Sequence, residues 1–154
     1  MYIILNELTI RISHILCNFT SMESSKIVLF DGVCNLCNSS VQTIIEHDSQ
    51  NQFRFASLQS EFGQVFLAKN NFNQNDFDSI ILIEGSLFYT KSEAVLRIGK
   101  NLDKYKLISK MLLFIPRNIR DFGYKIVAKN RYNWFGKKDN CWLPTPELKE
   151  KFIN

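Results

Sequence analysis

The clearest structural signal of this 154-residue chain is residues 26–37, Lys26-Ile27-Val28-Leu29-Phe30-Asp31-Gly32-Val33-Cys34-Asn35-Leu36-Cys37. After one lysine the run is continuously apolar, which is typical of a strand buried on both faces. Asp31-Gly32 ends this strand. Apolar residues then recur at helical spacing through Ile45, so we expect a helix from about Cys34 to His47. The cysteine pair therefore falls where a buried strand passes into a helix.

Further strands and helices follow in a regular order. We expect strands at 53–58, 79–84 and 86–90, the last two forming a hairpin, and helices at 61–69, 92–98, 104–115 and 118–129. A polar, Asn-rich loop is expected at 70–75, and Gly, Asn and Pro predict a loop wrapped on the body at 131–146. The order predicts an α/β protein with a thioredoxin-like mixed sheet, flanking helices and an added helical C-terminal segment.

Composition indicates one globular domain. Hydrophobic residues make up 45% of the chain and aromatic residues 13%, which excludes intrinsic disorder for most of its length. No apolar run approaches the ~20 residues that cross a bilayer. We expect the domain to span residues 26–143, with a loosely ordered N-terminal extension at 1–25 and a tail at 144–154.

The N-terminal extension lacks the sequence pattern of an export signal. Glu7 and Arg11 interrupt what would be its apolar centre, and no small-residue cleavage site follows. An alternative interpretation is a helix that lies on a membrane surface or a partner. Without an export signal we expect a cytoplasmic protein, in which a tight cysteine pair indicates catalysis or metal binding.

Charge is unevenly placed along the chain. Residues 1–96 hold five basic and ten acidic side chains, whereas residues 97–140 hold twelve basic and three acidic ones. A basic half can indicate nucleic acid, an acidic membrane surface or an anionic partner. The alternative is the solvated side of amphipathic helices, because one stripe of the last helix is apolar and consists of Ile119, Phe122, Ile126 and Val127. We expect no nucleic-acid partner, since zinc-finger spacing and RNA-binding aromatic signatures are missing.

The Cys34/Cys37 spacing favours redox chemistry. Unpaired N–H groups and the positive end of the helix dipole stabilise a thiolate at a helix N-terminus, and the thiolate is the attacking species. We therefore predict that Cys34 is the nucleophile and Cys37 the resolving thiol. No metal or organic cofactor is needed, because the two sulfurs carry the electrons.

Two other interpretations of the pair stay open, half of a zinc site and a pair of packing cysteines. A zinc site would need two further ligands. The other cysteines and histidines of the chain are His14, Cys17, His47 and Cys141, and they show no second close pair.

Asp31, three residues before Cys34, has two possible roles. A partly buried carboxylate there would take the proton from Cys37 during resolution. Alternatively, Asp31 forms an Asx-type cap that shapes the turn with Gly32.

Several blocks of the chain resemble the DCC family of thiol-disulfide oxidoreductases, named for an Asp-Cys-Cys triplet. The matching blocks are 31–37, 54–60, 92–96, Pro116 with Arg120-Asp121 and Tyr124, and 130–137 with Cys141. The resemblance covers about residues 26–143. It implies a thioredoxin-like fold and exchange with a thiol or disulfide substrate, either protein or small molecule. Better-known thioredoxin-like enzymes place a cis-proline before the strand that faces the site, whereas here Phe77-Asp78-Ser79 precede Ile80.

The block around Arg131 has two interpretations. It would fold over the redox site, where Arg131 steadies a thiolate and Cys141 acts as a third exchanging thiol. Alternatively, Tyr132, Trp134 and Phe135 anchor a loop and Cys141 is a small buried hydrophobe. Arg131 and Cys141 are therefore secondary site candidates. The competing function for the whole chain is a non-catalytic binding module whose basic helical region docks an anionic partner.

Overall fold

The computed structural model describes residues 25–72, 79–137 and 146–153. Its strands form one sheet in the order β2-β1-β3-β4, and they are β1 (Lys26–Phe30), β2 (Phe53–Ser57), β3 (Ile81–Glu84) and β4 (Leu87–Thr90). Strands β1 and β2 are parallel, whereas β3 is antiparallel to both β1 and β4. The predicted mixed sheet of thioredoxin-like type is thereby confirmed.

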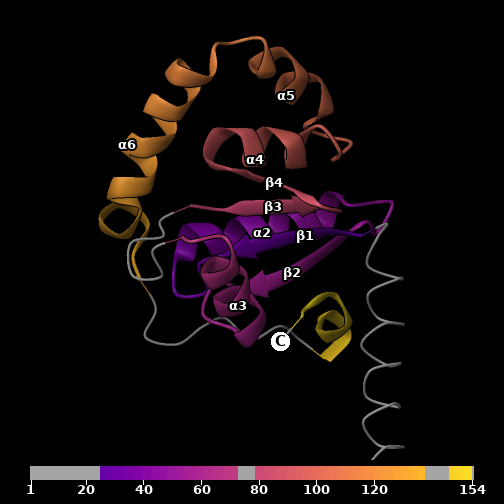
Figure 1. Ribbon diagram of the computed structural model, residues 1–154. Coiled ribbons are helices and arrows are strands. Elements are labelled where there is room, and N and C mark those ends of the chain that lie inside the picture. Colours follow the sequence, from indigo (N-terminus) through magenta and orange to yellow (C-terminus); the bar gives the residue numbers. More distant parts are fainter. Residues whose placement is uncertain (1–24, 73–78, 138–145, 154) are drawn as a thin grey trace, which may run out of the picture.

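Helices cover both faces of the sheet (Figure 1). They are α2 (Asn35–His47), α3 (Glu61–Lys69), α4 (Lys91–Gly99), α5 (Lys106–Leu113) and α6 (Arg117–Phe135), and the 3-10 helix η1 (Pro146–Lys151) follows. Side chains alternate along β1, so Val28 and Phe30 pack in one cluster with residues of α2 and α4. Ile27 and Leu29 pack on the other face with α3. The continuous apolar run of β1 is explained by this two-sided burial.

The turn from β2 into α3 brings polar residues to the carboxyl ends of β1 and β2. Ser60 caps α3, because its hydroxyl accepts the Gly63 N–H at 3.2 Å. Gly63 lies so close to the end of β2 that a Cβ there would overlap the carbonyl oxygen of Ser57 and lie 2.8 Å from that of Leu58. This contact fixes the turn that carries Gln59.

Helices α5 and α6 form an arch around α4 (Figure 1). The apolar stripe of α6 points outward: Ile119, Phe122, Ile126 and Val127 are all exposed. A core-facing stripe is what amphipathicity normally indicates, and this expectation is wrong for α6. Within the described residues no helix is long and apolar enough to cross a membrane.

Helix α6 also extends further than expected. It runs to Phe135, so the loop predicted from Arg131 begins only at Gly136, whose φ of 82° ends the helix. Two residues of the last turn, Arg131 and Tyr132, bind Asp31 and hold this turn in place. Trp134 and Phe135 are exposed, so they do not anchor a loop to the core.

The segment after η1 packs against the domain. The Ile153 N–H donates to the Phe55 carbonyl at 2.8 Å, and the ring of Phe152 lies 5.5 Å from the ring of Phe55. Phe152 also contacts the ring of Phe30 edge-on at 6.2 Å between centroids. The expected tail thus contributes aromatic packing beside β2.

Candidate active site

Both cysteines of the pair lie at the strand-to-helix junction. Cys34 is the N-cap of α2 and has extended backbone angles, and its carbonyl accepts the Asn38 N–H at 3.0 Å. Cys37 follows in the first turn of α2. The side chain of Cys34 caps no backbone N–H, and the N-terminal end of a helix favours negative charge.

Asp31 shapes the turn before Cys34. Its Oδ1 accepts the Val33 N–H at 3.1 Å, which is an Asx-type turn. The Gly32 N–H donates to Gln59 Oε1 at 3.1 Å, and the Asn38 side chain donates to the Gly32 carbonyl at 3.0 Å. Three hydrogen bonds to side chains therefore fix the backbone between β1 and α2.

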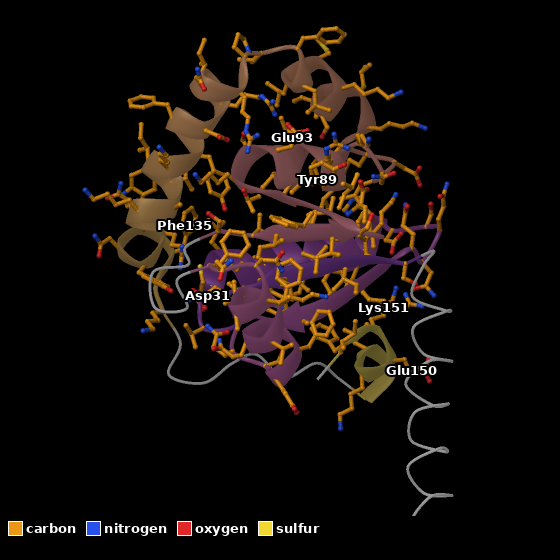
Figure 2. All side chains as sticks on the ribbon, viewed as in Figure 1. Asp31, Tyr89, Glu93, Phe135, Glu150 and Lys151 are labelled. Carbon is orange, nitrogen blue, oxygen red and sulfur yellow. The ribbon has the colours of Figure 1, made fainter. Side chains whose placement is uncertain are left out.

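The carboxylate of Asp31 is also the centre of a buried polar network. Arg131 donates to Oδ2 at 2.9 Å, Gln59 donates to Oδ1 at 2.9 Å, and the hydroxyl of Tyr132 donates to Oδ2. Asp31 is only 6% exposed and Arg131 only 3%. Figure 2 shows Asp31 on the side of the molecule where α6 ends, and Phe135 is labelled on the same side. Two residues that lie 100 positions apart thus form one buried ion pair.

The network keeps Asp31 ionised. Burial alone would raise the pKa of this carboxyl. Hydrogen bonds from Tyr132, Gln59 and the Val33 N–H, together with the charge of Arg131, outweigh burial and lower the pKa below its ordinary value. The same contact raises the pKa of Tyr132 to about 12, through burial and then through its hydrogen bond to Asp31. Asp31 therefore lacks the raised pKa of a group poised to accept a proton near neutrality.

The environment of Cys37 disfavours its thiolate. The pKa of Cys37 is raised to about 12, first by burial and then by the charge of Cys34 and a hydrogen bond to it. The positive charge of Arg131 acts in the opposite direction and lowers this pKa. A Cys37 thiol that stays protonated beside Cys34 can donate a hydrogen bond to a Cys34 thiolate, which suits a nucleophile and a resolving partner.

Cys34 is completely buried, which the sequence pattern does not reveal. It is 0% exposed, whereas Cys37 is half-buried. Cys34 forms an isolated antiparallel bridge with Lys137. Asn35 fastens the same segment, because its side chain donates to the Phe135 carbonyl at 2.9 Å and its N–H donates to the Gly136 carbonyl at 3.5 Å. We call Phe135, Gly136 and Lys137 the cover.

Helix α6 reaches the sheet at a second point near the site. The Ile80 N–H, just before β3, donates to the hydroxyl of Tyr124 at 3.1 Å. Burial raises the pKa of Tyr124, and the charge of Cys37 raises it further. Ile80, beside the position where better-known thioredoxin-like enzymes carry a cis-proline, is thus held here by a side chain of α6.

The structure brings together Cys34, Cys37, Asp31 and Arg131, whereas Cys17 and Cys141 lie outside the described residues. Gln59, Tyr132 and Asn38 complete the site. The sequence offered no role for Gln59 and Asn38, and for Tyr132 it offered only the anchoring of a loop. Gln59 and Tyr132 stand in the blocks that resemble the DCC family, which was the available signal. In the described part of the chain no group of three or more His, Cys, Asp or Glu side chains is placed to hold a metal ion.

Comparisons with known proteins identify the family to which this sequence is similar. A family model described as DCC1-like thiol-disulfide oxidoreductase matches residues 28–137. The uncharacterized protein YuxK of Bacillus subtilis (strain 168) is 43% identical over 129 residues, which are 84% of this chain and 94% of that protein. The chloroplastic DCC family protein At1g52590 of Arabidopsis thaliana is 42% identical over 127 residues, which are 82% and 74% of the two chains. No solved structure matches significantly.

Proposed function

Because the chain belongs to the DCC1-like thiol-disulfide oxidoreductase family, we propose that it exchanges disulfides through Cys34 and Cys37. Family membership confirms the resemblance seen in the sequence. The observation that carries the proposal is the sulfur pair itself. Cys34 caps a helix N-terminus, and Cys37, one turn later, keeps its proton and hydrogen-bonds to Cys34. Thiols or disulfides, of proteins or small molecules, are the substrates.

The reaction runs in two balanced steps. The Cys34 thiolate attacks one sulfur of a substrate disulfide, forms a mixed disulfide and releases the other sulfur as a thiolate, which takes up a proton. Cys37 then loses its proton, attacks the Cys34 sulfur, closes the Cys34–Cys37 disulfide and releases the second substrate thiolate. The second substrate thiolate also takes up a proton. Counted from the Cys34 thiol, which loses its proton to become the attacking thiolate, the substrate gains two electrons and two protons, and the protein loses them. Run backwards, the same steps oxidise a dithiol.

Asp31 and Arg131 act as positioning residues in this proposal. Their ion pair joins the β1–α2 turn to the last turn of α6, and this brings a guanidinium charge close enough to lower the pKa of Cys37. That charge assists the second step, in which Cys37 must ionise. The fully hydrogen-bonded carboxylate favours the turn-shaping role for Asp31 over the proton-accepting one.

Access to Cys34 requires a local movement, and we infer that the cover, which is bridged to Cys34, is the part that moves. The sulfur is buried, and a substrate disulfide has to approach it in line with the bond that breaks. Two hydrogen bonds from Asn35 hold Phe135 and Gly136, and one of them is long at 3.5 Å. Opening at the end of α6 is a local event that leaves the sheet and the Asp31–Arg131 pair intact.

Trapping the intermediate tests the proposal. Cys17 and Cys141 are first replaced by serine, so that only the pair remains. In this background Cys37→Ser should accumulate a mixed disulfide with oxidised glutathione at Cys34, detected by mass spectrometry. Cys34→Ser is the matched control and should trap far less, because Cys37 holds its proton.

Two results would contradict the proposal. Equal trapping in both variants would remove the assignment of Cys34 as nucleophile. Failure of Cys34 and Cys37 to form a disulfide in any glutathione redox buffer would remove the exchange function.

The proton-accepting role of Asp31 is tested by Asp31→Asn, since loss of a base would shift the pH profile of resolution. The cytoplasmic location stays a prediction, as do the exchange role of Cys141 and the domain boundaries.

A further inference from the structure

The outer sides of α5 and α6 carry apolar side chains that no described part of the chain covers. Phe114, between the two helices, is 90% exposed and Phe122 is 68% exposed. We call the following exposed residues the outer apolar face: Leu107, Ile108, Met111, Phe114, Ile119 and Phe122. Exposed apolar residues that occur singly are ordinary, but a continuous set along two helices indicates an interaction surface.

The outward direction of these residues is enforced by polar contacts on the inner side of α6. Arg120 pairs with Glu93 of α4 at 3.0 Å, Tyr124 binds the Ile80 N–H, and Arg131 pairs with Asp31. These three residues share one side of the helix at 100° per residue. Rotating α6 to bury its apolar stripe would break all three contacts, so the stripe is available for something outside the domain.

Helix α5 is attached in a similar way. Its buried residue is Ser109, which lies against Gly99 of α4, where a Cβ would overlap the serine hydroxyl. Leu107 and Met111 lie on the opposite side of α5 from Ser109 and are exposed, whereas Leu113, on the side of Ser109, is half-buried. Both helices thus leave a set of large apolar side chains open on their outer sides.

Basic side chains border the outer apolar face. Residues 100–137 contain ten basic and two acidic residues. Lys106 and Lys110 lie about 100° and 60° around α5 from Leu107, both on the same side of it, and Lys125 lies about 60° around α6 from Phe122. All three lysines are exposed. Both acidic residues accept hydrogen bonds from this chain, Asp103 from Ser49 and Asp121 from Ser92 and Arg117.

We propose that the outer apolar face binds the surface of an anionic lipid bilayer. Apolar side chains that insert into the headgroup boundary, with lysines along the edge, are the features of interfacial helices. Lysine stems can lie along apolar surface while the ammonium group reaches a lipid phosphate. The turn between α5 and α6 is the outermost part of the arch (Figure 1), so the most exposed phenylalanine leads the approach.

Charge separates a bilayer from the other candidate occupants. A second copy of the chain would bring two strongly basic faces together, which like-charge repulsion opposes. A nucleic acid would meet phenylalanine and leucine where its phosphates require cations. An anionic bilayer offers both an apolar layer and negative headgroups, and each basic residue near such a surface strengthens binding about fivefold.

Vesicle flotation of the full chain tests the proposal. We expect binding to vesicles that mix phosphatidylcholine with phosphatidylglycerol, weak binding to phosphatidylcholine alone, and release at high salt. Phe114→Ser with Phe122→Ser should abolish flotation, and Lys106→Gln with Lys110→Gln should weaken it about 30-fold. The controls are Val65→Ser and Lys69→Gln on α3, which change equally exposed side chains outside the face.

These variants should keep the melting temperature of the parent, because every altered side chain is exposed. Flotation that is absent, or that is unchanged by the phenylalanine and lysine pairs, would overturn the proposal. So would a concentration-dependent dimer in sedimentation that disappears in the phenylalanine variant, since that outcome assigns the face to a second copy. Binding to an acidic protein without binding to vesicles would overturn the proposal as well. The disulfide-exchange test is independent, because it uses the cysteines alone.

Discussion

Replacing Arg131 by methionine should destabilise the protein far more than the same change elsewhere on α6. Methionine keeps most of the length of the side chain and removes its charge. The Asp31 carboxylate would then stay buried, 6% exposed, without its ion-pair partner. Breaking a buried pair in this way costs about 3–5 kcal/mol, a large share of the ~5–15 kcal/mol that stabilises a typical domain. For a domain of this size the melting temperature should fall by roughly 6–20 °C.

Arg117→Met is the matched control. Arg117 also pairs with an aspartate, Asp121, at 3.4 Å on the same helix, but its side chain is 61% exposed. Exposed pairs contribute about 0–1 kcal/mol, so this variant should melt within a few degrees of the parent. Calorimetry or urea unfolding followed by circular dichroism measures both variants.

The pH dependence supplies a second check. The pKa of Asp31 is lowered in the folded protein, so its contribution to stability is present above the unfolded value of about 3.9 and is lost as the pH falls through the folded value. In Arg131→Met the carboxyl loses one of the groups that lower its pKa, and it can be neutralised more easily. The stability difference between parent and variant should therefore narrow as the solution is acidified.

Two outcomes would refute this reasoning. One is a loss of stability in Arg131→Met no larger than that in Arg117→Met. The other is a stability difference between the parent and Arg131→Met that stays constant from neutral to acid pH. A double variant, Asp31→Asn with Arg131→Met, should lose less stability than the two single changes together, because neither leaves the other charge uncompensated.

Four smaller changes test other parts of the fold. Gly63→Ala should lower the free energy of unfolding by about 1–3 kcal/mol, because the new Cβ overlaps the Ser57 carbonyl. Gly123→Ala has nothing within 4 Å of its Cβ position and should stabilise α6 by ~0.5–1 kcal/mol. Urea midpoints measure both variants, and equal effects would contradict the close packing of Gly63 against the end of β2. Phe152→Ala should lower stability by up to about 3–5 kcal/mol, and an unchanged midpoint would show that the segment after η1 does not pack on β2. Gly136→Ala places a Cβ 3.1 Å from the Asn35 side chain at a φ of 82°. A strain of ~1–3 kcal/mol should open the cover ~5- to ~150-fold more often and speed alkylation of Cys34, and an unchanged rate would mean that the cover does not limit access.

The parts of the structure that local pattern determines were predicted well. The apolar run of β1, the helical spacing of α2 and the hairpin of β3 and β4 are properties of neighbouring residues, and so is the position of the cysteine pair between strand and helix. The resemblance to the DCC family added Arg131 to the candidate residues.

The features that were missed depend on contacts between distant segments. The last turn of α6 is held by Asp31, 100 positions away, so local propensity placed the end of the helix too early. The apolar stripe of α6 suggested a buried face, but Arg120, Tyr124 and Arg131 orient the helix by polar contacts that periodicity does not detect. The complete burial of Cys34 was missed as well, and this residue also makes a long-range contact, its bridge to Lys137.

The cover over Cys34 acts differently on the rate of disulfide exchange and on its equilibrium constant. A sulfur that is reached only in an opened form reacts at the intrinsic rate multiplied by the fraction opened. The reduction potential, in contrast, compares the dithiol and disulfide end states. A change that shifts the cover equally in both redox forms alters the speed of exchange and leaves its equilibrium untouched. Amide hydrogen exchange at the end of α6 and the rate of disulfide exchange should therefore rise and fall together.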